Sequence, residues 1–60
     1  MTVSQVLASL RGVARRAFAD WRRRPDDTNG ATALAAFIAV RAAESHLLGQ
    51  PVTRLPEGWQ

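Results

Sequence analysis

The chain has 60 residues, no cysteine and a formal net charge of +3. Disulfides are therefore excluded, and a sequence with one histidine and no thiol is not expected to form a zinc site from its own side chains. All of its basic residues are arginines, and a charge of this size permits nucleic acid, an acidic protein or an anionic surface as a partner. A chain this short buries little surface, so a lone core is expected to contribute no more than ~3–5 kcal/mol. We therefore expect a partner to complete the fold.

The first predicted element is a helix over about residues 3–24. Thr2 is its expected N-cap, with Gln5 three residues later in the spacing of a capping box. The apolar side chains of this segment fall within about 140° of a helical wheel, which predicts one face directed at a core. Pro25 ends the helix. The members of this apolar face are Val3, Val6, Leu7, Leu10, Val13, Ala14, Ala17, Phe18 and Trp21.

A turn is predicted over residues 25–29, where Asp27, Thr28 or Asn29 could cap the next helix. A second helix then covers about residues 30–48, with Gly49 just past its end and Pro51 beyond, the usual stop pattern. A connection this short makes the two helices antiparallel neighbours. The sequence thus predicts an all-α helical hairpin over residues 1–49.

The second helix carries no charge over residues 33–40, which is typical of a helix buried on all sides. One half of its wheel holds bulky side chains, which are expected to pack on the first helix. The other half is rich in alanine and allows close approach of another helix, as in alanine coiled coils. We therefore predict an oligomer interface that contains Ala35, Ala39, Ala42 and Ala43.

Two charged residues, Arg41 and Glu44, interrupt the bulky half of the second helix. Their spacing allows them to pair with each other on the helix surface. One alternative is that the bulky half of the wheel widens toward the C-terminal end of the helix and both side chains extend to water. The other is that they form a polar contact at a partner interface.

Arg11, Arg15 and Arg22 lie on one stripe of the first helix, within about 40° of each other. Such a stripe could follow the phosphates of a nucleic acid, or contact an acidic protein. It could equally be a solvated face, with Asp20 spaced to pair with Arg16 and Arg24. The sequence leaves these three alternatives open.

The tail over residues 50–60 is expected to be irregular, because it contains two prolines and a glycine. Trp59 near its end is a possible docking anchor, since tryptophan is a favoured interface residue. It could dock on its own hairpin or dimer mate, or on another protein.

The layout of two antiparallel helices and a loose tail in about sixty residues is similar to that of Rop-type RNA-binding dimers. The resemblance is architectural, and it rests on the layout and on no shared motif. It implies that a hairpin of this size can be completed by a second copy as an antiparallel four-helix bundle.

The function predicted from the sequence is a small non-enzymatic protein-interaction module, an adaptor, inhibitor or regulator of a kind frequent in phages and mobile elements. Its predicted partners are a second copy and an unidentified protein. The alternative is a nucleic-acid-binding regulator that uses the arginine stripe. No catalytic, cofactor or metal site is predicted, because His46 has no suitably placed acidic partner. The longest uncharged apolar run is far shorter than a membrane span, which favours a cytoplasmic protein. A third hypothesis is a cationic amphipathic peptide that lies on a membrane surface.

Overall fold

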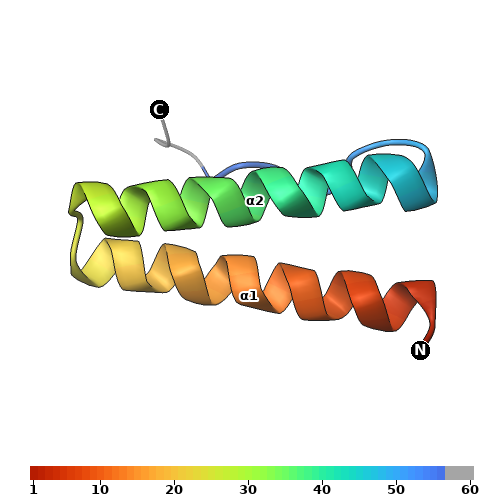
Figure 1. Ribbon diagram of the computed structural model, residues 1–60, viewed down its shortest axis with the longest axis horizontal. Coiled ribbons are helices and arrows are strands. Elements are labelled where there is room, and N and C mark those ends of the chain that lie inside the picture. The colour runs from red at the N-terminus through yellow and green to blue at the C-terminus, as the bar shows by residue number, and fades with distance from the viewer. Residues whose placement is uncertain (57–60) are drawn as a thin grey trace.

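The computed structural model describes residues 1–56, which form two α-helices and the first part of the tail. Helix α1 spans Val3–Arg23 and helix α2 spans Asp27–Leu48. The two helices lie side by side and antiparallel, joined by a short turn (Figure 1). The all-α hairpin predicted from the sequence is confirmed.

The start of α1 is fixed by a capping box. The Thr2 hydroxyl accepts a hydrogen bond from the Gln5 N–H at 3.1 Å, and the Gln5 side chain accepts one from the Thr2 N–H at 2.8 Å. Two N–H groups that the helix itself leaves without partners are thereby bonded. The predicted N-cap is confirmed.

Helix α2 begins at Asp27, before the position predicted, because its N-cap is Asp26 and not Asp27, Thr28 or Asn29. The Asp26 carboxylate accepts a hydrogen bond from the Asn29 N–H at 2.7 Å. The turn is therefore shorter than predicted, and the Asn29 side chain closes it by donating to the Arg24 carbonyl at 3.0 Å.

At its other end α2 stops at Gly49, whose φ of 86° is a left-handed conformation that glycine adopts without strain. The chain then turns back and the tail runs along α2 (Figure 1). The left-handed glycine predicted from the sequence is thus what reverses the chain direction.

The core between the helices is small. Within residues 1–56, five apolar residues are buried, and Phe18 packs edge-on against Phe37 with ring centroids 6.1 Å apart. The buried apolar residues are Leu7, Ala14, Ala33, Phe37 and Val40. The buried residues of α2 are Ala33, Phe37, Val40 and Glu44, spaced by four, three and four residues. This spacing places them in one stripe along the helix, which a single antiparallel neighbour can cover.

The expectation that the whole bulky half of α2 packs on α1 is wrong. Phe37 and Val40 are buried, but Leu34 and Ile38 are exposed, the latter by 55%. Leu47 and Leu48 are exposed as well. The reason is geometric, because one neighbouring helix covers a narrower arc than the bulky half occupies.

The molecule measures 33 × 21 × 15 Å between its Cα atoms, and its two helices form a single layer of helices lying side by side (Figure 1). Stable domains are generally built from two or more packed layers. Apart from the tail, no second layer covers the hairpin in the part of the chain that the structure describes.

Candidate functional site

The most tightly organised polar group in the molecule is the Glu44 carboxylate, which is 0% exposed. From α1, Arg11 donates to Glu44 Oε2 through Nε at 2.9 Å and through Nη2 at 2.6 Å. From the tail, the Thr53 hydroxyl donates to the same oxygen at 2.6 Å. The N–H groups of Val52 and Thr53 donate to Oε1 at 3.0 and 2.8 Å. Glu44 therefore connects both helices and the tail.

These contacts set the ionisation of Glu44. Burial on its own raises the pKa of the carboxyl group, because it penalises the charged form. Hydrogen bonds from the Thr53 hydroxyl and N–H, and then from Arg11 and Val52, outweigh this effect and lower the pKa to about 2. Glu44 is consequently a carboxylate at neutral pH, with all of its oxygens bonded.

Arg41 completes the contact with the tail by donating from Nη1 to the Thr53 carbonyl at 3.2 Å. Together, Arg11, Arg41 and Glu44 form what we call the polar clamp. The clamp bonds both the N–H and the C=O of Thr53, so it fixes the backbone of the tail and not only a side chain. The sequence suggests that Glu44 either extends to water or contacts a partner. In the structure it is instead buried and bonded to α1 and to the tail of its own chain.

The clamp also contains one member of the predicted arginine stripe on α1, Arg11. The Arg11 side chain is 33% exposed and its charge is paired with Glu44. Arg15 is exposed, and the Arg22 guanidinium lies 5.9 Å from the centre of the Phe18 ring. Asp20 pairs with Arg23, and not with the arginines expected from the sequence.

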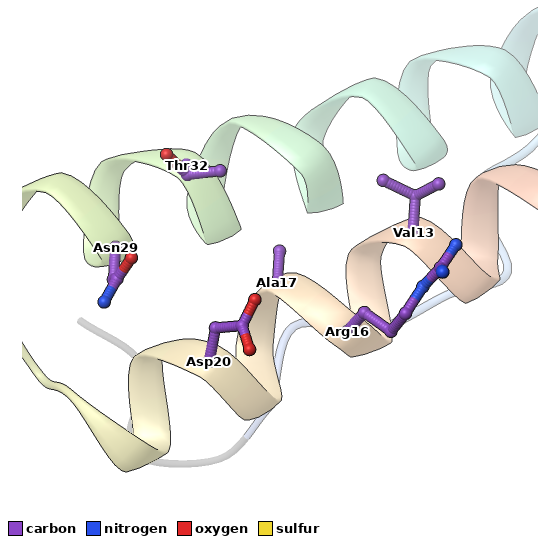
Figure 2. Close-up of a pocket in the computed structure, with 6 residues that line it drawn as sticks. All are labelled: Val13, Arg16, Ala17, Asp20, Asn29 and Thr32. Carbon is purple, nitrogen blue, oxygen red and sulfur yellow. The ribbon is translucent and has the colours of Figure 1, made fainter.

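The opposite side of the hairpin is uncovered. Arg41 and Thr32 are nine positions apart on α2, so their directions differ by about 180° around the helix axis. The tail bonds to Arg41 on one side, and Thr32 faces a shallow hollow of about 300 Å³ on the other. Figure 2 shows this hollow between the helices, lined by Val13, Arg16, Ala17, Asp20, Asn29 and Thr32.

We call this side the open face and define it by Val13 and Ala17 of α1 and by Thr32, Ala39 and Ala43 of α2. Ala39 follows Thr32 by seven residues, so both lie on the same side of α2. Val13 and Ala39 are exposed, and Ala17 and Ala43 are half-buried. The open face is therefore a flat, largely apolar strip with small side chains on α2.

The predicted interface residues divide between two places. Ala39 and Ala43 belong to the open face, whereas Ala35 and Ala42 lie further around α2, where both are exposed. The predicted docking anchor, Trp59, lies outside the residues that the structure describes.

Over residues 1–56, no group of three or more histidine and acidic residues is placed to hold a metal ion. By length and composition alone, α2 is apolar enough to cross a membrane, with a mean hydropathy of 1.3 over its most apolar window. A core helix of a soluble protein passes the same test, so the observation is weak. Its Glu44 is bonded to α1 and to the tail.

Comparison with protein-family models, with curated proteins and with solved structures gives no match for this chain.

Proposed function

We propose that this protein is a small protein-interaction module that acts as a homodimer, with the open faces of two hairpins packed against each other as a four-helix bundle. The observation that carries the proposal is the exposed strip of small and apolar side chains on a hairpin of only two described helices. Pairing two such layers would create the second layer that a helical core needs.

The exposed area supports a partner of this size. Compact monomers follow a size scaling that gives about 3,900 Å² of accessible surface for a 6.6-kDa chain. This chain exposes 4556 Å², about 650 Å² more than that value and somewhat less than the ~800 Å² that each partner buries in a standard interface. A second copy would bring the exposed area per chain to the value of a compact protein.

The chemistry of the open face also fits a second copy. Residues 28–40 of α2 carry no charge, and Ala39 and Ala43 allow two helices to approach closely. Arg16 and Asp20 at the edge of the hollow carry opposite charges. A two-fold axis brings the same patch of each subunit together, so such an edge can complement itself.

The test is the mass in solution of the Ala39→Glu variant, measured by sedimentation or by light scattering after gel filtration. We expect the wild-type chain to have the mass of a dimer and Ala39→Glu to have that of a monomer, because a buried, unpaired carboxylate opposes association. Ala19→Glu, on an exposed position of α1 outside the open face, is the matched control and should remain dimeric. A wild-type monomer, or a dimer in both variants, would overturn the proposed seam.

The alternative, nucleic-acid binding through the arginine stripe, predicts a different result. Binding to duplex DNA or RNA would weaken steeply with salt, and would fall further in Arg15→Ala. Arg11 is already paired with Glu44, which leaves Arg15 and Arg22 of the three. We expect no such binding at low salt, measured by fluorescence anisotropy with labelled duplexes.

A further inference from the structure

The bonds that hold the tail are polar and concentrated on two residues. Three of them join Thr53 to Glu44 or to Arg41 through backbone groups or the hydroxyl, and a fourth comes from the Val52 N–H. Of these four bonds, the one from the Thr53 hydroxyl goes to Glu44 Oε2, where Arg11 also donates. The polar clamp thus recognises an extended backbone with a hydroxyl side chain at one position.

The apolar side chains of the tail are only partly buried. Val52 is 58% exposed and Leu55 is 37% exposed. A segment held by few apolar contacts belongs to the least stable part of a fold and opens without global unfolding. The tail is therefore held by the polar clamp more than by burial.

The clamp has a strong requirement for an occupant. If the tail leaves, Glu44 Oε1 loses both of its donors, and a carboxylate on the inner stripe of α2 is left with Arg11 on its other oxygen. A buried charge with unmet hydrogen bonds is unfavourable. Any segment that presents the same donors can restore them.

The chain has a suitable hinge between the helix and the occupant. Gly49 has a left-handed conformation, and Gln50 and Pro51 after it are exposed. A short hinge next to a small exchangeable element is the arrangement from which segments swap between identical chains.

We infer that the polar clamp is a binding site for an extended, threonine-containing segment, and that the tail of a second copy can occupy it in place of the chain's own tail. This inference depends on the proposed function in one respect, because a second copy must be present to supply the segment. The bonds formed are the same in both cases, since the donors come from the same residues.

The experiment uses the full-length chain with Thr53→Val as receptor and a blocked synthetic peptide of residues 50–56 as probe. The substitution removes the hydroxyl but keeps the branched shape, so the chain's own tail competes less strongly. NMR titration of the labelled chain measures the affinity. Arg54→Ala, which changes an exposed side chain of the tail, is the matched control receptor.

We expect the peptide to bind Thr53→Val about thirtyfold more tightly than it binds the Arg54→Ala control, the effect of one hydrogen bond to a charged group. A peptide with valine in place of Thr53 should bind about thirtyfold more weakly for the same reason. Equal affinity of the two peptides, or no binding to a Thr53→Val chain of wild-type helicity, overturns the inference.

If Thr53→Val loses helicity, the same two peptides are titrated into the wild-type chain, where the threonine peptide must still bind more tightly than the valine peptide. The result of this titration can be distinguished from the result of the mass measurement on Ala39→Glu. A dimer that binds neither peptide contradicts this inference alone, and a monomer that discriminates between the peptides contradicts the proposed function alone.

Discussion

Arg11 of α1 and Glu44 of α2 are joined by two hydrogen bonds, at 2.9 and 2.6 Å, across 33 positions of sequence. The pair lies where the tail also meets the helices, so one carboxylate connects three segments that are far apart along the chain. Several measurable properties follow from this connection.

The first prediction concerns pH. The folded pKa of Glu44 is about 2, below its ordinary value of 4.5. The stability that its ionisation contributes is therefore fully present above about pH 4.5 and is lost as the pH falls through about 2. Chemical denaturation at a series of pH values should show stability falling through this window.

The control for this pH series is Glu44→Gln, which cannot ionise at position 44. We expect it to be less stable than the wild-type chain at neutral pH, and to lose less stability on acidification. Parallel pH profiles in the two proteins would contradict the assignment of this effect to Glu44.

The second prediction concerns the coupling between Arg11 and Glu44. Arg11→Met and Glu44→Gln should each lower the melting temperature, because each leaves the other group without its charged partner. The double variant should lose less than the sum of the two, since the bond can be lost only once. Strict additivity in thermal unfolding at a fixed protein concentration would show that the two side chains do not interact.

The third prediction isolates the hydroxyl of Thr53. Thr53→Val should lower the free energy of unfolding by about 2 kcal/mol, the size of a hydrogen bond to a charged group. Thr53→Ser keeps the hydroxyl and should stay closer to the wild-type chain. Urea unfolding followed by circular dichroism measures both, and equal losses in the two variants would refute the assigned role of the hydroxyl.

The fourth prediction compares two neighbouring aspartates at the start of α2. Asp26→Ala removes the cap on the Asn29 N–H and should cost about 1 kcal/mol of stability. Asp27→Ala, in the first turn of the helix, removes a favourable interaction with the helix dipole worth roughly 0.3–1 kcal/mol. The larger loss must therefore fall on Asp26 in denaturant unfolding, and the reverse order would place the cap elsewhere.

The fifth prediction uses two helical glycines. A Cβ added at Gly12 meets no atom within 4 Å, so Gly12→Ala should stabilise the protein by about 0.5–1 kcal/mol. A Cβ at Gly30 lies 3.2 Å from the Trp21 side chain, so Gly30→Ala should gain less or lose stability. A larger gain at Gly30 than at Gly12 in thermal unfolding would contradict this packing.

Much of the fold was predictable because its signals are local. The capping box at Thr2 and Gln5 and the glycine at position 49 are read from neighbouring residues, and each lies where expected. The sequence does not single out the N-cap of α2 because several adjacent polar residues can serve as a cap. The residue that adopts the extended conformation required of a cap is Asp26.

The polar clamp was only partly predictable. Arg11 and Glu44 were both singled out, and counting outward from the turn of an antiparallel hairpin brings them to similar heights on facing helices. Their pairing could therefore have been proposed. The role of Thr53 could not, because an irregular tail has no periodicity from which its path follows.

The exposure of Ile38 shows a second limit of sequence patterns. A wheel divides α2 into a bulky half and a small half, but the number of neighbouring helices decides how much of either half is covered. With one neighbour, Ala33 is buried and Ile38 is exposed, the opposite of what side-chain size alone suggests.

The backbone bonds from Val52 and Thr53 to Glu44 give the molecule a built-in reporter of partial opening. Their amide hydrogens are protected from exchange with solvent only while the tail is bound, whereas the amides in the middle of α1 and α2 are protected by the helices themselves. Exchange at these two amides therefore measures how often the tail detaches, and exchange in the helices measures how often the whole hairpin unfolds.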